Sequence, residues 1–335
     1  MTKETHDFGL EEGERYEPPE INEYFDLSQP HVMTALGPID PSALEFTLHH
    51  EHIICKPGNS GDPDLVLDDP AAALAELEDA YQVGLRSILD MTTADYGRNF
   101  PAVTWVAQRA PVHIVLATGH HQHQHAAPFL GNASVEEIAR CSISELQQGI
   151  DRSGTRAGVI KAGTSLNVIT DVERRVLEAA ALAHLATGAP ISTHTERGTM
   201  ALEQVEILKN AGIKPSTVII GHMDFAMDEA YLRSVLETGA SISFDQVSKT
   251  KYAVDEDRAE MLKRLVDAGH LGQLLVSGDL GRRSYLLAYR GGPGIRYLVE
   301  RFPLVMMEAG LTAKQVRTIY VDNPARALTT SPPRA

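Results

Sequence analysis

The 335-residue sequence is poor in cysteine and in aromatic side chains. Its two cysteines, Cys55 and Cys141, cannot build the disulfide framework of a secreted domain, and so few cysteines are typical of a reducing cytoplasm. Aromatic residues make up 6% of the chain and hydrophobic residues 43%. A chain of this length and composition is predicted to bury a large aliphatic core in a single domain.

Long apolar runs and positive charge are also scarce. No stretch approaches the roughly 20 apolar residues of a membrane-spanning helix. The start, MTKETHDFGLEEGERYEPPE, is acidic where a secretory signal is basic and then apolar. Since 30 Lys and Arg stand against 45 Asp and Glu, the net charge is −15. Nucleic acids and anionic membranes bind basic surfaces, so we expect neither as a partner and predict a cytoplasmic protein that acts on a small molecule.

Apolar β-branched runs alternate with amphipathic helical stretches along most of the chain, which predicts repeated βα units and a parallel sheet. Eight such repeats predict an α/β fold, a (β/α)8 TIM barrel over residues 31–330. The expected strands are Leu44–His50, Arg86–Met91, His113–Thr118, Gly158–Lys161, Pro190–His194, Thr217–His222, Ala240–Asp245 and Gln273–Asp279.

Helix start signals lie between these strands. Asp69 is followed by a proline, Asn99 opens the next helix, and Ser134 and Thr170 each have a glutamate three positions later, as in a capping box. The histidine-rich segment after the third strand is predicted to be a polar loop, and the glycine-rich segment after the eighth a long loop over one barrel end. Thr312 is predicted to cap a helix near the C-terminus.

The acidic segment 1–30 contains proline and shows no periodicity, so it is predicted to be a tail. The alternative is a strap on a neighbouring subunit, which would imply a homodimer.

Polar side chains fall at the ends of the predicted strands, on the face where (β/α)8 barrels carry their chemistry. His50 and His52 are two residues apart on an extended strand, so both imidazoles point to the same side and can reach one metal ion. Lys161 lies where the barrel interior should be apolar, and a lone buried ammonium is unfavourable. Condensed with carbon dioxide, Lys161 becomes an anionic carbamate with two oxygens, which can bridge two cations.

Three more strand ends carry metal-binding side chains. His194 ends the fifth predicted strand in the segment PISTHT, His222 ends the sixth in VIIGHMD, and Asp279 ends the eighth in LLVSGD. Four imidazoles, one carbamate and one carboxylate suit two divalent ions, zinc in the first place, with manganese or cobalt as alternatives. The predicted metal ligands are His50, His52, Lys161, His194, His222 and Asp279.

The segments TLHHEH, VGLRSILDMTTADYGR, GVIKAGTS, PISTHTERG, VIIGHMD, LLVSGDLGR and NPARAL resemble, in the same order, those of the phosphotriesterase family of the amidohydrolase superfamily. The resemblance covers about residues 31–328. It implies that His50, His52 and Asp279 bind the more buried metal, that His194 and His222 bind the more exposed one, and that carboxylated Lys161 bridges them.

This site predicts a metal-dependent hydrolase. Two cations lower the pKa of a shared water, so that hydroxide can attack a carbonyl or phosphoryl centre at neutral pH. Asp279 is predicted to accept the proton of that nucleophile, and carboxylated Lys161 is predicted to bridge the two metals.

The loops after the seventh and eighth strands are cationic for so acidic a chain. Lys249, Lys251, Arg282 and Tyr285 have the chemistry of a phosphate-binding set, although solvated surface charges are the alternative. The segments SKTKY and GRRSY most resemble the family branch that opens phosphorylated sugar lactones. The resemblance implies that a lysine after the seventh strand and an Arg-x-x-Tyr after the eighth hold the phosphate. Lys251, Arg282 and Tyr285 match that spacing best, and Lys249 is a weaker candidate. The predicted substrate is therefore a phosphorylated pentonolactone; organophosphate, aryl ester or N-acyl amide hydrolysis is the alternative.

Two features stay open. His120, His121, His123 and His125 crowd the loop after the third strand, where they could touch substrate, capture a metal or be chance polar residues. Tyr96 and Arg98, after the second strand, could line the pocket or tie loops together.

Overall fold

The computed structural model describes residues 16–20, 24–58 and 61–331. Much of the predicted acidic segment 1–30 lies outside the described residues, so its role as a tail or strap stays a prediction.

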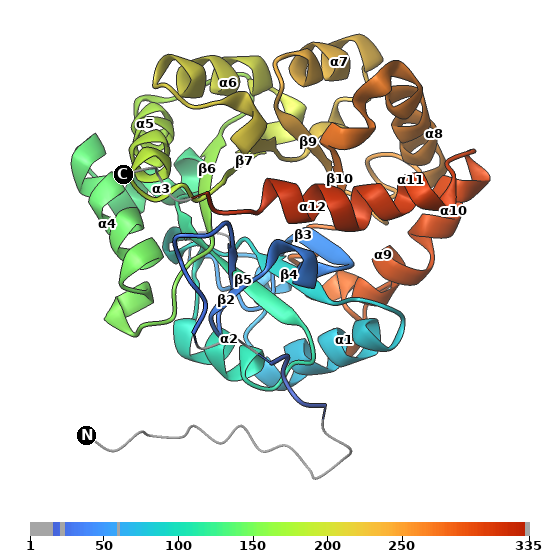
Figure 1. Cartoon of the computed structure of the whole chain (residues 1–335), viewed down its shortest axis with the longest axis horizontal. Coiled ribbons are helices and arrows are strands. Elements are labelled where there is room, and N and C mark those ends of the chain that lie inside the picture. Colours follow the sequence, from blue (N-terminus) through green and yellow to red (C-terminus); the bar gives the residue numbers. More distant parts are fainter. Residues whose placement is uncertain (1–15, 21–23, 59–60, 332–335) are drawn as a thin grey trace.

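Eight parallel strands form the predicted (β/α)8 barrel, each hydrogen-bonded to the next in chain order (Figure 1). Each observed strand lies within or overlaps its predicted range. Most are shorter than predicted, whereas β6 continues to Thr164, three residues beyond Lys161. The strands are β3 (Thr47–Glu51), β4 (Ser87–Asp90), β5 (His113–Gly119), β6 (Val159–Thr164), β7 (Ile191–Thr195), β8 (Val218–Ile220), β9 (Ser241–Phe244) and β10 (Leu274–Val276).

The first and last strands close the barrel through the residues that follow them. The backbone N–H of Asp279 donates to the His50 carbonyl at 3.0 Å. The buried Glu51 carboxylate accepts from the Ser277 hydroxyl at 2.7 Å and from the backbone N–H groups of Gly278 at 2.6 Å and Leu280 at 2.8 Å. Barrel closure therefore fixes the end of β3, which carries the first two predicted ligands, next to the segment that carries Asp279.

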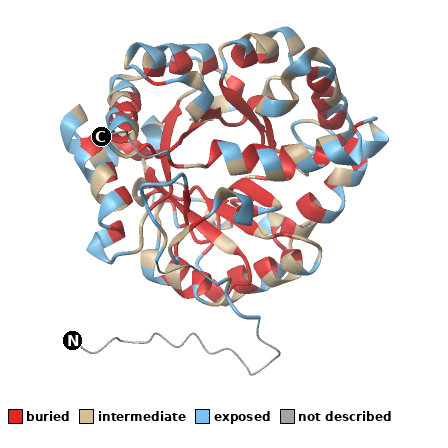
Figure 2. Ribbon diagram, in the orientation of Figure 1, coloured by how far each residue is buried: buried red, intermediate tan, exposed pale blue. Residues whose placement is uncertain are grey.

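Twelve helices are found in the described part of the chain, and most of them surround the barrel with their apolar sides inward (Figures 1 and 2). They are α1 (Pro70–Gln82), α2 (Phe100–Ala107), α3 (His123–Leu130), α4 (Val135–Gln147), α5 (Asp171–Thr187), α6 (Ala201–Asn210), α7 (Glu229–Glu237), α8 (Asp255–Leu265), α9 (Ile295–Glu300), α10 (Phe302–Glu308), α11 (Ala313–Arg317) and α12 (Asn323–Ala327). None of these helices is both long and apolar enough to cross a membrane.

The predicted start signals cap the helices as expected. Asp69 accepts from two backbone N–H groups at the start of α1, Asn99 caps α2, and Ser134, Thr170 and Thr312 form complete capping boxes. The prediction of a plain loop after the third strand is wrong, because α3 begins at His123. This helix has no capping side chain at its start and contains Pro128, so the usual start signal is missing, and it packs against α5 and the loop after β4.

Strand alternation separates two apolar layers. Leu89, Val115, Val159, Ile219 and Leu275 belong to a cluster that fills the barrel interior, while their sequence neighbours pack against the helices. This interior cluster reaches the antiparallel pair β1 (Val32–Met33) and β2 (Pro38–Ile39), and also the end of α12.

The helix α12 lies across the end of the barrel where the strands begin. The Asn323 side-chain amide donates to the Leu271 and Leu274 carbonyls, each at 2.7 Å. The opposite end, where the strands finish, is left for the polar residues.

Candidate metal centre

The barrel brings the predicted ligands of the more buried metal together. The Nε2 atom of His52 lies 3.4 Å from Asp279 Oδ1, and the Nε2 atom of His50 lies 3.9 Å from the same oxygen. His50, His52 and Asp279 thus offer three ligand atoms that all lie within 4.8 Å of one another, a spacing that could hold one metal ion. The His52 Nδ1 atom lies 2.8 Å from the Thr92 hydroxyl, which orients the ring with Nε2 toward Asp279.

Lys161 is completely buried beside this group, with its Nζ 3.2 Å from His50 Nε2. Among the described residues, no carboxylate forms an ion pair with it. Burial lowers the pKa of Lys161 to about 8, because the ammonium is poorly solvated there. An amine with a lowered pKa is more often in the neutral form that reacts with carbon dioxide. The position therefore fits a carbamate that bridges two metals.

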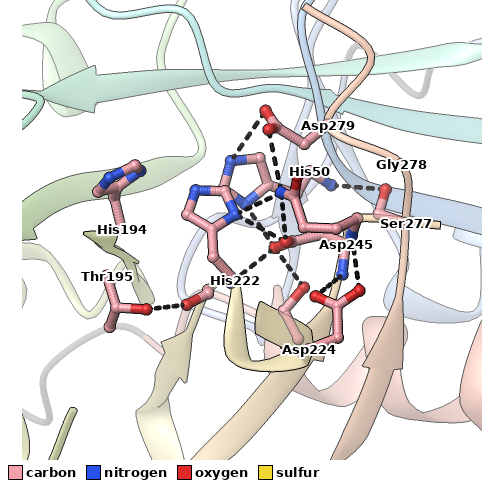
Figure 3. Close-up of polar contacts among 12 residues, drawn as sticks. His50, His194, Thr195, His222, Asp224, Asp245, Ser277, Gly278 and Asp279 are labelled. Carbon is pink, nitrogen blue, oxygen red and sulfur yellow. Dashed lines mark hydrogen bonds and ion pairs between the residues drawn. The ribbon is translucent and has the colours of Figure 1, made fainter. Parts of the chain in front are cut away.

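The two ligands predicted for the more exposed metal lie beside the first group, with the His194 and His222 ring centroids 4.4 Å apart. Burial lowers the pKa of His194 to about 4, so its imidazole is neutral and able to bind a metal at pH 7. Figure 3 shows His194 and His222 projecting toward the same region as His50 and Asp279. The backbone of His222 and of Asp279 is left-handed, with φ of 61° and 48°. Non-glycine residues rarely adopt this conformation, and such outliers are concentrated at functional sites.

The sequence analysis missed Asp245, which follows β9 and orients two of these imidazoles (Figure 3). Its Oδ1 accepts from His222 Nδ1 at 2.6 Å, and its Oδ2 lies 3.3 Å from His50 Nδ1. Burial alone would raise the pKa of Asp245, but the neighbouring His222 and His50 hold it well below its usual value. Asp245 closes the predicted strand Ala240–Asp245, so a strand-end carboxylate was the available signal.

Asp245 is better placed to orient imidazoles than to bind the metal itself. His50, His222 and Asp245 do form a second compact group of donors. Both histidines, however, present Nδ1 to the carboxylate, so the Nε2 atom of each ring faces away from Asp245; that of His50 lies toward Lys161 and Asp279. A carboxylate on the distal nitrogen fixes the ring and increases its basicity, as in many metal sites.

Tyr96 and His121 complete a ring of aromatic contacts around the site. Centroid distances are 4.9 Å from His52 to Tyr96, 4.8 Å from Tyr96 to His121 and 4.6 Å from His121 to His194. Tyr96 also lines the cavity over the predicted ligands. The sequence left the roles of Tyr96 and Arg98 open, and the structure places Tyr96 in the lining of the pocket.

Arg98 ties loops together instead. Its guanidinium pairs with Glu145 at 2.5 Å and donates to the Ala117 carbonyl at 2.8 Å. In the histidine-rich segment, His120, His121 and His125 are buried and His123 is exposed at the start of α3.

A cavity of about 140 Å³ opens over the predicted ligands His52, His194, His222 and Asp279. Lys249, Arg282 and Tyr285 line it, whereas Lys251 does not. The Lys251 side chain is exposed, with its Nζ 4.7 Å from the Tyr252 ring centroid and 5.5 Å from that of Tyr285.

The two cations that were predicted to bind substrate and that line the cavity are both paired with carboxylates. Lys249 donates to Asp279 Oδ2 at 3.0 Å, to the Asp279 carbonyl at 2.7 Å and to Gln246 Oε1 at 2.9 Å. The Arg282 Nη1 atom donates to Asp62 at 2.7 Å and lies 3.3 Å from Asp64. Lys249 thus holds Asp279 in place, and the Asp62 loop orients Arg282.

Comparison with known proteins agrees with this geometry. Residues 30–328 match the model of the phosphotriesterase family. A phospho-furanose lactonase of Mycoplasmopsis synoviae is 31% identical over 319 residues, which cover 88% of this chain and 90% of that protein. An N-acetyltaurine hydrolase of Danio rerio is 28% identical over 342 residues, 89% of this chain and 97% of that protein.

Solved structures agree as well. A lactonase of Listeria monocytogenes superposes with a TM-score of 0.86 at 35% identity, covering 90% of this chain and 99% of that one. The phosphotriesterase homology protein of Escherichia coli, solved with phosphate in its active site, superposes with a TM-score of 0.82 at 35% identity, covering 87% of this chain and all of that one, 100%. With its (β/α)8 barrel and clustered His and Asp side chains, this chain is a hydrolase that belongs to the phosphotriesterase family.

Proposed function

We propose that this hydrolase opens a phosphorylated sugar lactone, of the pentonolactone size, with two divalent metal ions. The observation that carries the proposal is the single cavity in which His52, His194, His222 and Asp279 meet Arg282 and Tyr285. The phospho-furanose lactonase relative and the phosphate in the active site of the Escherichia coli protein support the same chemistry.

His50, His52 and Asp279 would hold one ion, His194 and His222 the other, and carboxylated Lys161 would bridge them. To form the bridge, Lys161 Nζ attacks the carbon of carbon dioxide, an N–C bond forms and one proton leaves to water. Zinc suits this set of nitrogen and oxygen donors, and manganese or cobalt are the alternatives. When bound, two such ions supply an activated water and a Lewis acid for the carbonyl oxygen.

Asp279 is the proton acceptor in this proposal. Lys249 and Gln246 both contact its Oδ2, at 3.0 Å and 3.1 Å, which leaves Oδ1 facing His50 and His52. As water attacks the lactone carbonyl, one of its protons moves to the Asp279 carboxylate, and from there to the ring oxygen that leaves as an alcohol. Lys249 thus holds the Asp279 carboxylate in position. Lys251, Arg282 and Tyr285 would hold the phosphate, and Arg282 would do so through its Nε and Nη2 atoms.

The alternative is hydrolysis of an N-acyl amide, an aryl ester or an organophosphate at the same centre. The relative named N-acetyltaurine hydrolase favours the amide among these. Neutral triesters carry no anionic group that could accept from the Arg282 guanidinium and the Tyr285 hydroxyl, which line the cavity. The proposed cytoplasmic location and homodimer stay predictions.

A substrate panel tests the proposal. The metal-loaded enzyme is assayed with 5-phosphorylated pentonolactones, the same lactones without phosphate, N-acyl amides and aryl phosphotriesters. We expect kcat/KM to be highest for a phosphorylated lactone. Faster turnover of an amide or a triester would overturn the lactonase proposal, while the assignment of the chain as a hydrolase would still hold.

The metal bridge is tested separately with Lys161→Ala. We expect bound metal to fall well below two ions per chain and most activity to be lost, with partial recovery in acetate, whose carboxylate can occupy the vacated space. Full metal content and full rate without acetate would contradict a bridging carbamate.

A further inference from the structure

Two of the cations that line the cavity, Lys249 and Arg282, are already paired with carboxylates. Lys249 is buried against Asp279, and Arg282 is held by two carboxylates, those of Asp62 and Asp64. Neither group therefore adds a net positive charge to the cavity. A phosphate that carries close to two negative charges at pH 7 needs at least one cation that is not already paired.

Arg197 is such a cation, and the sequence analysis did not single it out. It lines the same cavity, three positions after His194, and its side chain is exposed. Within residues 16–20, 24–58 and 61–331, no hydrogen bond or ion pair engages its guanidinium. The neighbouring Glu196 makes no ion pair with it, because the Glu196 carboxylate is turned to His194 Nε2, 3.2 Å away, and accepts from Gln122 at 3.0 Å.

The backbone holds Arg197 in a conformation that arginine seldom adopts. Its φ and ψ are 53° and 36°, in the left-handed region, which is unfavourable for a residue with a Cβ. Gly198 follows, with φ of 74°, and a Cβ there would lie 2.8 Å from the Cβ of Ala226. The turn is thus packed tightly against the loop after β8, which fixes the point from which the Arg197 side chain leaves the backbone.

We propose that Arg197 binds the phosphate monoester group of the substrate with its unpaired guanidinium, together with Arg282. This inference rests on the proposed lactonase function. The cavity of about 140 Å³ holds on the order of five water molecules, so a phosphate inside it lies close to its walls. The guanidinium fork of Arg197 can take two phosphate oxygens, and the oriented Arg282 lines the same cavity.

Phosphate binding by Arg197 is tested with three variants: Arg197→Ala, Arg197→Lys and the exposed control Arg301→Ala. Each is assayed with a phosphorylated lactone and with the same lactone lacking phosphate. For Arg197→Ala we expect KM for the phosphorylated lactone to rise on the order of 10- to 100-fold, the range for a lost charge-assisted hydrogen bond. The unphosphorylated lactone should change less than threefold. Arg197→Lys should recover part of the loss, and Arg301→Ala should behave as wild type.

Binding of inorganic phosphate to the metal-loaded protein gives a second readout that needs no substrate. We expect Arg197→Ala to weaken it by a similar factor without changing the melting temperature. Equal losses for both lactones, or unchanged phosphate binding in Arg197→Ala, would overturn the role. If wild type hydrolyses no lactone but binds phosphate more tightly than Arg197→Ala, the lactonase proposal fails and the Arg197 site stands. If wild type binds no phosphate, the Arg197 site is overturned as well.

Discussion

At the scale of single residues, Asp245 has the widest influence on the candidate metal centre without being a predicted ligand. It contacts Nδ1 of both His222 and His50. In Asp245→Asn the amide offers one acceptor oxygen instead of two and loses the negative charge, so the two rings are less firmly oriented. We expect the affinity for zinc, measured by competition with a chelator, to fall about 10- to 100-fold.

The matched control for this change is Asp257→Asn, which removes an exposed carboxylate on α8. It should leave zinc affinity unchanged. An Asp245→Asn variant that binds zinc as tightly as wild type would show that Asp245 does not orient the ligands.

Buried histidines give the metal-free protein a defined pH dependence. Burial lowers the pKa of His49 and of His194 from 6.5 to about 4. Between these values the unfolded chain binds more protons than the folded one, so stability is present above pH 6.5 and lost as the pH falls toward 4. The buried Glu51 and Asp224, whose pKa values burial raises to about 7 and about 6, oppose this effect, because both bind more protons in the folded chain and so favour folding at lower pH. Since the pKa values of His50 and His121 are lowered as well, four buried histidines outweigh these two carboxyl groups.

We therefore expect the free energy of unfolding in urea to be on the order of 2–4 kcal/mol lower at pH 4.5 than at pH 6.5. The His49→Gln variant lacks one of these groups and should show a shallower slope. A free energy of unfolding that is equal at the two pH values, or higher at pH 4.5 than at pH 6.5, would show that these histidines are not held neutral.

At the scale of elements, Glu51 joins the first strand of the barrel to the segment after the last. Its two oxygens accept three hydrogen bonds, from Ser277, Gly278 and Leu280. In Glu51→Gln one oxygen becomes an NH2 group that faces N–H donors, which leaves buried donors unsatisfied. We expect a loss of about 2–4 kcal/mol in the free energy of unfolding.

The exposed Glu237→Gln, on α7, makes the same chemical change without such contacts and should shift stability by less than about 0.5 kcal/mol. Because Asp279 lies between Gly278 and Leu280, Glu51→Gln should also lower metal content. Wild-type stability in Glu51→Gln would mean that closure depends on other contacts.

At the scale of the whole molecule, metal binding and folding should be coupled, since the predicted ligands come from five different strands or the loops after them. A ligand that binds only the folded state stabilises it by about 2.7 kcal/mol at one hundred times its Kd. For a chain of 335 residues that is a rise of roughly 4 °C in Tm per site. Thermal unfolding after chelation and after return of zinc measures this rise. His222→Ala should show a smaller rise, and a Tm independent of zinc would contradict a specific metal centre.

The family and the barrel could be predicted from the sequence because both depend on local, repeating signals. Strand periodicity, capping residues such as Ser134 and Thr170, and polar residues at strand ends are properties of short segments. Parallel strands in a barrel end on one face, so His50, Lys161 and Asp279 could be assigned to one site before any contact was known. The predicted loop after the third strand was wrong because α3 is stabilised by its neighbours and not by its own pattern.

Only the tertiary structure decided which charges are available for a ligand. Lys249, Lys251, Arg282 and Arg197 are alike as cations in the sequence, yet two of them are neutralised by carboxylates that lie 30 to 220 positions away along the chain. The role of Asp245 was hidden for the same reason, since His222 and His50 reach it from 23 and 195 positions away. Electrostatic pairing depends on distances of a few ångströms in space, and the order of residues along the chain does not contain those distances.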